Sequence, residues 1–433
     1  MNRIQVDEVI DRAKVSPFHW RILFWCTLII VFDGYDLVIY GVVLPILMQQ
    51  WQLDPVTAGA LGSTALFGMM VGAMLLGTLA DRFGRKKMIV LCVILFSGFT
   101  ALNGLAQTPL QFGIMRFIAG LGIGGVMPNV VALMSEYAPR RIRSTLVAVM
   151  FSGYAIGGMM SASLGIWIVP QFGWQVMFYL AVIPLLLLPV IWSQLPDSVA
   201  FLVQQGKTDT ARRVLRSLSG QAIADDAVLT VHQPQKTEQS LGALFSHNRA
   251  LSTLMFFQAF FMCLLMVYGL GSWLPKLMSM AGYGFSSSLM FLLFLNIGGI
   301  IGAIGGGWLS DRFHPRPVLM LFFTLAAVSL ALLGFKNHVA VLYLLVTVAG
   351  ATTIGSQILL YAYVAQFYPT AIRSTALGWS SGVGRIGAIL GPVLGGALLA
   401  MQLSHQMNFL AFVIPGALAV IAIMLTAGRK EAV

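Results

Sequence analysis

Long apolar stretches alternate with short polar ones along the whole chain. Twelve of them have about the 20 residues that an apolar helix needs to cross a bilayer. They predict helices over 22–47, 56–79, 87–106, 110–134, 145–169, 175–195, 251–275, 287–309, 317–336, 340–365, 373–400 and 407–427. The stretches lack the apolar–polar alternation of membrane barrel strands. The pattern therefore predicts an all-α membrane protein with twelve transmembrane helices.

Composition and charge placement agree with this prediction. Hydrophobic residues make up 58% of the 433 residues and charged residues only 9%, whereas soluble proteins have about 25% charged residues. The net charge of +11 could suggest a nucleic-acid partner, but all but four of the 26 Lys and Arg residues lie at the termini and in alternate loops. This positive-inside distribution predicts two cytoplasmic termini, a bacterial-type inner (plasma) membrane location, contact with membrane lipid and no nucleic-acid partner. The charged N-terminal MNRIQVDEVIDRAK does not resemble a cleavable signal peptide.

The chain also repeats itself. One long polar stretch separates the first six predicted helices from the last six, so we expect halves at 1–195 and 251–433 joined by a cytoplasmic loop at 196–250. GTLADRFGRKK around Asp81 matches GGWLSDRFHPR around Asp311, and SEYAPRRIRSTLVAV around Pro139 matches AQFYPTAIRSTALGW around Pro369, both at an offset of 230 residues. Duplicated, pseudo-symmetric six-helix halves around a central site are typical of secondary transporters.

Four segments resemble those of a known family. GTLADRFGRKK (77–87) resembles the loop signature of the major facilitator superfamily, and RFIAGLGIGG (116–125) resembles its helix-4 motif. FDGYDLVIYGVVLP (32–45) and GRIGAILGP (384–392) resemble the first-helix and helix-11 segments of aromatic acid:proton symporters. Within that family the sequence as a whole resembles the benzoate transporters. The resemblance implies the major facilitator fold and that both aspartates of the first-helix segment are needed for transport.

Those aspartates, Asp33 and Asp36, lie inside an otherwise apolar helix. Their i, i+3 spacing places them on one face, and a charge in mid-bilayer costs at least about 2.5–3.5 kcal/mol. Two close carboxylates at low dielectric do not both ionise easily. We therefore expect at least one of them to bind the transported proton. The alternative is structural: Asp36 permanently neutralises an arginine.

Two arginines and one glutamate complete the charged candidates. Arg385 is placed by its helix near the depth of Asp33, where a guanidinium can hold the substrate carboxylate or lock to an aspartate in the empty protein. Arg116 could pair with Asp36, tune proton coupling or contact substrate. Glu136 could form a salt bridge with loop arginines or act as a second proton relay.

The remaining candidates line a binding cavity or form a gate. For substrate contact we consider Tyr35, Asn129, Asn296, Gln357 and Tyr361. For gating we expect a charge network that breaks when the transporter inverts, in which Asp81 pairs with loop arginines such as Arg143. Its members are Asp81, Arg82, Arg85, Arg143, Asp311 and Arg312.

The sequence shows no phosphate-binding loop and no metal-ligand cluster. We therefore expect no enzyme and no cofactor, with the proton gradient as the energy source. The prediction is a monomeric symporter that imports protons with a small aromatic carboxylate, benzoate or a hydroxybenzoate, by alternating access. The alternatives are an efflux antiporter, a transporter of another organic anion such as muconate, and a non-transporting sensor.

Overall fold

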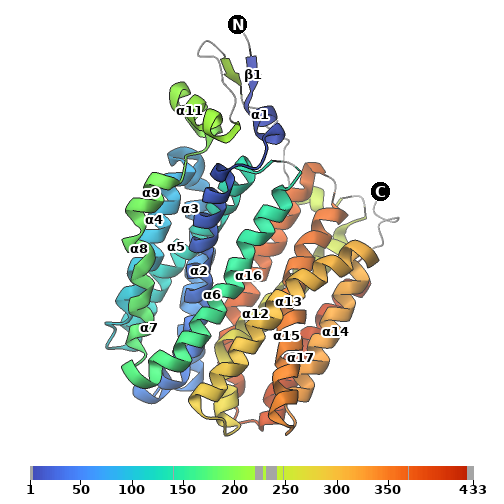
Figure 1. The fold of residues 1–433 in the computed structure, drawn as a ribbon. Helices are drawn as coiled ribbons and strands as arrows, with labels where there is room; N and C mark the ends of the chain where they lie inside the picture. Colours follow the sequence, from blue (N-terminus) through green and yellow to red (C-terminus); the bar gives the residue numbers. More distant parts are fainter. Residues whose placement is uncertain are drawn as a thin grey trace. The chain divides into compact units, whose positions relative to one another are not determined.

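The computed structural model describes residues 3–139, 141–219, 228–230, 241–246, 248–368 and 370–426, and their helices dominate the molecule (Figure 1). The elements up to the middle of the chain are β1 (Arg3–Gln5), α1 (Val6–Arg12), α2 (Pro17–Gln50), α3 (Pro55–Phe83), α4 (Arg85–Asn103), α5 (Pro109–Tyr137), α6 (Arg143–Phe172), α7 (Gln175–Tyr179), η1 (Leu180–Val182), α8 (Ile183–Leu186), α9 (Leu188–Gln194), α10 (Val199–Gln204) and α11 (Thr208–Ser219). The later elements are β2 (Val228–Thr230), η2 (Leu241–Leu244), α12 (Ala250–Met280), α13 (Phe285–Phe313), α14 (Pro315–Leu333), α15 (Val339–Phe367), α16 (Thr370–Ala400) and α17 (His405–Leu425).

The prediction of twelve apolar spans is confirmed within the described part of the chain, where 12 helical segments are long and apolar enough to cross a membrane. The first span begins earlier than expected, at Pro17. The sixth, Gln175–Gln194, is interrupted as α7, η1, α8 and α9. Pro184 and Pro189 explain this interruption, because proline lacks the backbone N–H that a continuous helix needs. The end of the last expected span, residue 427, lies outside the described residues.

Local sequence signals determine several helix starts. The Thr108 hydroxyl accepts a hydrogen bond from the Gln111 backbone N–H at 3.3 Å, and Pro109 follows as the first residue of α5. The Ser404 hydroxyl caps α17 in the same way, with Met407 N–H at 3.3 Å. Such caps satisfy backbone donors that the first helical turn leaves unpaired.

The chain forms two compact units. The first comprises residues 1–36, 67–157 and 178–235, and the second comprises 37–66, 158–177 and 236–433. The boundaries fall within α2, α3, α6 and α7, so these units do not coincide with the two six-helix halves that the sequence repeat predicts. The division at 1–195, 196–250 and 251–433 stays a prediction.

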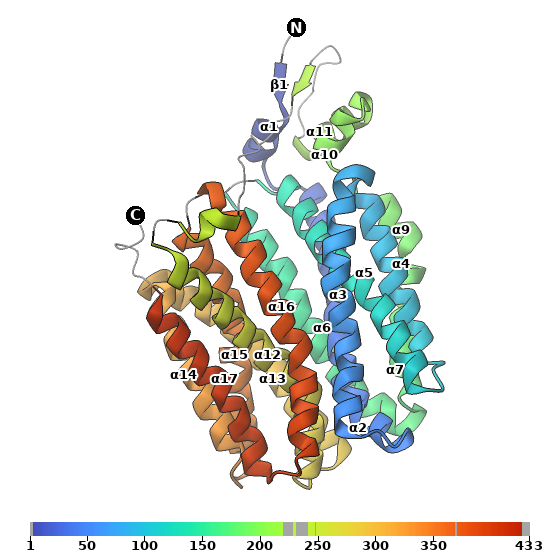
Figure 2. The same cartoon turned by 180° about the vertical axis from the view of Figure 1, so that it is seen from behind.

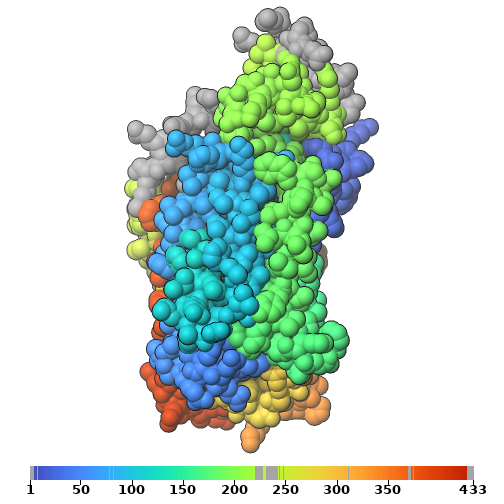
Figure 3. Space-filling view, turned by 90° about the vertical axis from the view of Figure 1, so that its left-hand side faces the viewer, coloured from blue at the N-terminus to red at the C-terminus, as the bar shows by residue number. Residues whose placement is uncertain are grey.

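In the first unit, the N-terminal segment and the middle of the chain form one small substructure. Strand β1 pairs in parallel with β2, with Arg3 opposite Val228. Both ribbon views show α1 beside α11 (Figures 1 and 2), and the Ser16 hydroxyl donates to the Leu218 carbonyl at 3.4 Å. Elsewhere in this unit, α4 and the α8–α9 segment pack together on one face (Figure 3, light blue and green).

In the second unit, α16 is fixed by contacts with α12 and with the start of α3. The Trp273 indole N–H donates to the Pro392 carbonyl at 2.8 Å, and the Ser63 hydroxyl donates to the Ile389 carbonyl. At Gly387 the α16 backbone approaches the Phe261 carbonyl so closely that a side chain would collide with it. These contacts hold the helix that carries Arg385.

Candidate functional site

The structure surrounds Asp36 with donors from two other helices. The Arg116 guanidinium on α5 lies 2.7 Å from Asp36 Oδ1 and also donates to the Asp36 carbonyl at 3.2 Å. The Thr100 hydroxyl on α4 donates to the same Oδ1 at 2.7 Å. The side chains of Asp36 and Arg116 are only 1% and 3% exposed. This geometry matches the structural alternative for Asp36, in which the aspartate neutralises an arginine. It also matches one of the roles considered for Arg116, which was to pair with Asp36.

Asp33, one turn earlier on α2, is equally buried but has a different partner. The Tyr154 hydroxyl on α6 donates to Asp33 Oδ2 at 2.7 Å. Tyrosine is neutral over the physiological pH range, with an ordinary pKa near 10. The two aspartates thus accept hydrogen bonds from different helices, Asp33 from α6 and Asp36 from α4 and α5.

Arg385 is half-buried on α16 in the second unit. Its guanidinium lies near the Tyr361 hydroxyl of α15, with which it interacts electrostatically. The Tyr361 ring packs edge to face against Phe260, with ring centroids 5.0 Å apart. A cation, a hydroxyl and two aromatic rings therefore lie near one another. This combination can hold a carboxylate and an aromatic ring at once.

The other predicted contact residues are spread over both units. Asn129 donates from Nδ2 to the Gly125 carbonyl of its own helix at 2.7 Å, and Asn296 donates likewise to the Leu292 carbonyl at 2.9 Å. Their amide N–H groups therefore have helix-internal partners. Tyr35 is buried, and Gln357 is half-buried on α15.

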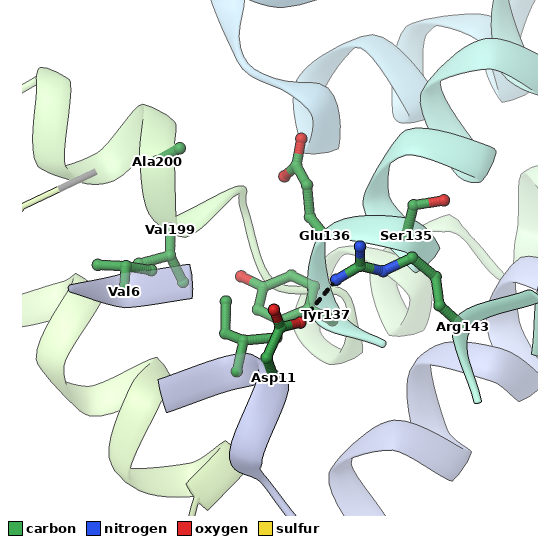
Figure 4. A pocket seen from close by; sticks show the side chains of 9 residues that line it. Val6, Asp11, Ser135, Glu136, Tyr137, Arg143, Val199 and Ala200 are labelled. Carbon is green, nitrogen blue, oxygen red and sulfur yellow. Dashed lines mark hydrogen bonds and ion pairs between the residues drawn. The ribbon is translucent and has the colours of Figure 1, made fainter. Parts of the chain in front are cut away.

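Glu136 and Arg143 lie at a cavity of about 240 Å³ in the first unit (Figure 4). Its lining combines α1, the end of α5, the start of α6 and the start of α10, through Val6, Ile10, Asp11, Ser135, Glu136, Tyr137, Arg143, Val199 and Ala200. Arg85 Nε lies 2.5 Å from Glu136 Oε1, and Arg143 Nη2 lies 2.9 Å from Asp11 Oδ1. Glu136 thus forms a salt bridge with a loop arginine, the first of the two roles considered for it.

The remaining gate candidates are only partly described. Arg82 stacks over the neighbouring Phe83 ring at 5.8 Å, and Arg312 lies over Trp308 at 5.6 Å. The side chains of Asp81 and Asp311 lie outside the described part of the structure. The expected pairing of Asp81 with Arg143 therefore stays a prediction.

Sequence reasoning missed Tyr154, Thr100 and Asp11. A tyrosine or threonine within an apolar helix is usually a packing residue, so neither gave a signal. Asp11 could have been considered, because a carboxylate in a basic N-terminal segment is available to pair with a loop arginine.

The segment GWSSG at 378–382 matches the G-x-S-x-G spacing of a hydrolase nucleophile elbow. That motif needs a sharp strand-to-helix turn to expose its serine. Here it lies inside α16, and Ser380 is buried. It is therefore not a nucleophile elbow. Among the described residues, no group of three or more His, Cys, Asp or Glu could hold a metal ion.

Comparison with known proteins decides the family. The model of the Major Facilitator Superfamily matches residues 26–313 and 296–432. The chain belongs to this superfamily. It is 51% identical to the benzoate transport protein of Acinetobacter baylyi over 99% of this chain and 93% of that protein. It is 41% identical to a gentisate transporter of Corynebacterium glutamicum over 88% and 82%, and 35% identical to the 4-hydroxybenzoate transporter PcaK of Pseudomonas putida over 97% and 95%.

Solved structures confirm the fold of this superfamily member. A bacterial homolog of the human lysosomal transporter Spinster has a TM-score of 0.75 at 18% identity, covering 97% of this chain and 99% of that one. A D-xylose–proton symporter has a TM-score of 0.74 at 19% identity, covering 95% and 99%. The protein is thus a multi-pass membrane transporter of the major facilitator fold and not an enzyme, and the resemblance to aromatic acid transporters is confirmed.

Proposed function

We propose that the protein is a proton-coupled symporter that imports a benzoate- or hydroxybenzoate-type carboxylate by alternating access. The observation that carries this proposal is the arrangement of buried charge. A half-buried arginine lies beside aromatic rings in one unit, and a buried aspartate with a neutral partner lies in the other. The names of the relatives, which refer to benzoate, gentisate and 4-hydroxybenzoate, support the same substrate class.

Arg385 is the proposed carboxylate ligand. A planar guanidinium can donate two parallel hydrogen bonds to a carboxylate, and the Tyr361 hydroxyl, which is hydrogen-bonded to Ser381, lies nearby. Phe260 and Tyr361 form the edge-to-face pair against which an aromatic ring can pack. The other candidate contacts, Tyr35, Asn129, Asn296, Gln357 and Arg116, have a secondary place in this proposal.

Asp33 is the preferred proton carrier. Protonating Asp36 would leave the Arg116 charge buried beside a neutral acid, and an unpaired buried charge costs several kcal/mol. The Tyr154 hydroxyl can donate to a charged Asp33 and accept from a protonated one, so this contact can survive protonation. Glu136 has a salt-bridge partner in Arg85, so we place it behind Asp33 as a relay candidate.

The setting of the proposed symporter follows from its charges. Lys and Arg residues at the termini and in alternate loops support a bacterial inner-membrane location with both termini in the cytoplasm. We propose a monomer, since each chain carries both the carboxylate ligand and the proton carrier. One proton entering with one monoanion makes the transport step electroneutral.

The test is uptake of radiolabelled benzoate into proteoliposomes under an imposed inward proton gradient. Asp33→Asn should abolish gradient-driven uptake. Arg385→Gln should raise the KM for benzoate at least tenfold, by about 1.4 kcal/mol of lost binding. Arg213→Gln, which removes an exposed arginine from α11, is the matched control and should behave as wild type.

Other outcomes identify the alternatives. Outward flux of benzoate driven by the gradient would indicate an efflux antiporter. Uptake of muconate in place of benzoate would change the substrate class. Benzoate binding without flux in either direction would indicate a sensor.

A further inference from the structure

Tyr154 makes a contact that the proposed transport cycle does not yet use. Its hydroxyl donates to Asp33 Oδ2 at 2.7 Å and lies 3.7 Å from the Met127 sulfur of α5. The tyrosine belongs to α6, more than a hundred residues away from Asp33 along the chain. Its side chain is half-buried, within the first compact unit.

Backbone packing fixes this contact. A Cβ atom on Gly34, the residue after Asp33, would collide with the backbone of Tyr154 itself. One turn along α6, a Cβ atom on Gly157 would collide with the Val31 carbonyl and the Tyr35 backbone nitrogen. Helices α2 and α6 therefore touch backbone to backbone on both sides of the hydrogen bond. This close approach fixes the backbones of Asp33 and Tyr154 relative to each other.

The chemistry of the pair differs from that of its neighbour on α2. A tyrosine hydroxyl can donate to a carboxylate and can also accept from a protonated acid, so the contact can persist in both protonation states of Asp33. Tyr154 approaches this turn from α6, and Arg116 approaches it from α5 with its charge paired with Asp36. A donor aimed at a carboxylate favours its charged form.

We propose that Tyr154 is a positioning residue that sets the proton affinity of Asp33. The proposal rests on the proposed function, because it gives Tyr154 a task only if Asp33 carries the proton. Without the hydroxyl the Asp33 carboxylate loses a stabilising donor and binds its proton more tightly. Loading then occurs at higher pH, and release to the other side becomes slower.

Two readouts on Tyr154→Phe in proteoliposomes test this. The pH midpoint of gradient-driven benzoate uptake should move up by about one unit, a tenfold change in proton affinity, as expected for a hydrogen bond to a charged group. Benzoate counterflow at equal pH on both sides, which needs no net proton movement, should stay within about twofold of wild type. Tyr179→Phe removes a hydroxyl that donates to the Gly104 carbonyl at 3.0 Å, and this matched control should change neither readout.

A third readout is independent of transport. The infrared band of a protonated carboxylic acid, assigned to Asp33 by its loss in Asp33→Asn, should appear at a pH about one unit higher in Tyr154→Phe than in wild type. An unchanged band titration would overturn the inference, and so would a parallel loss of uptake and counterflow with the band titration unmoved. Absence of benzoate uptake in wild type, with a shifted band, would overturn the proposed function and leave the Tyr154–Asp33 assignment standing.

Discussion

The buried ion pair between Asp36 and Arg116 allows a quantitative test of how α2 carries charge. Asp36→Leu removes every oxygen that the Arg116 guanidinium and the Thr100 hydroxyl contact on that side chain. The arginine would keep only its 3.2 Å bond to the Asp36 carbonyl. Since both side chains of the pair are at most 3% exposed, water cannot replace the lost partner without local opening.

The expected magnitude follows from this burial. Removing one partner of a buried pair costs about 3–5 kcal/mol, because the other charge is left uncompensated. Replacing both partners by apolar side chains of similar size is often close to neutral. Asp36→Leu combined with Arg116→Met should therefore recover most of the stability that Asp36→Leu alone loses.

The assay is the free energy of unfolding in mixed detergent micelles, followed by circular dichroism as denaturing detergent is added. Glu8→Leu serves as control, because the Glu8–Arg12 pair is 4.0 Å apart with side chains 61% and 85% exposed and should contribute under about 0.5 kcal/mol. The reasoning is refuted if Asp36→Leu is as mild as Glu8→Leu, or if the double variant is less stable than Asp36→Leu alone.

Three further predictions concern packing, charge and pH. Gly34→Ala should lower thermal stability and gradient-driven uptake because its Cβ meets the Tyr154 backbone, whereas Gly98→Ala, with nothing within 4 Å of its Cβ, should keep both at wild-type values. Arg143→Asp should speed proteolysis of the N-terminal segment by breaking the pair with Asp11, and adding Asp11→Arg should slow it again; equal rates in both variants would contradict this. Thr57 donates two hydrogen bonds to Asp54 at the start of α3, and these hold the Asp54 pKa below its ordinary value. This cap therefore stabilises α3 above about pH 4 and is lost as the pH falls through the lowered pKa. Hydrogen exchange in the first turn of α3 should then accelerate in wild type and not in Asp54→Ala.

The apolar spans could be predicted because length and composition alone determine whether a helix can cross a bilayer. Their ends were less predictable, since α2 begins at Pro17, before the apolar run, and the prolines of the sixth span divide it into short helices. The pairing of β1 with β2 was not expected. Each strand has only three residues, which is too short to give a periodic pattern, and the two strands lie far apart along the chain.

The sequence could single out the unusual charged residues of the apolar helices but not their partners. The spacing of Asp33 and Asp36 indicated that they share one face of a helix, and both are buried on α2. It could not show which partner each aspartate meets, because Arg116 and Tyr154 come from helices far along the chain. Those meetings depend on how α2 packs against α5 and α6, and no motif in α2 encodes this packing.

The different partners give a physical reason for two aspartates in one apolar turn. Asp36 brings a negative charge that Arg116 cancels, so this pair can stay buried without changing its protonation. Asp33 accepts a hydrogen bond from the Tyr154 hydroxyl, and this contact can persist when Asp33 gains or loses a proton. A turn with one fixed and one variable charge can hold its helices together while its net charge changes by one proton.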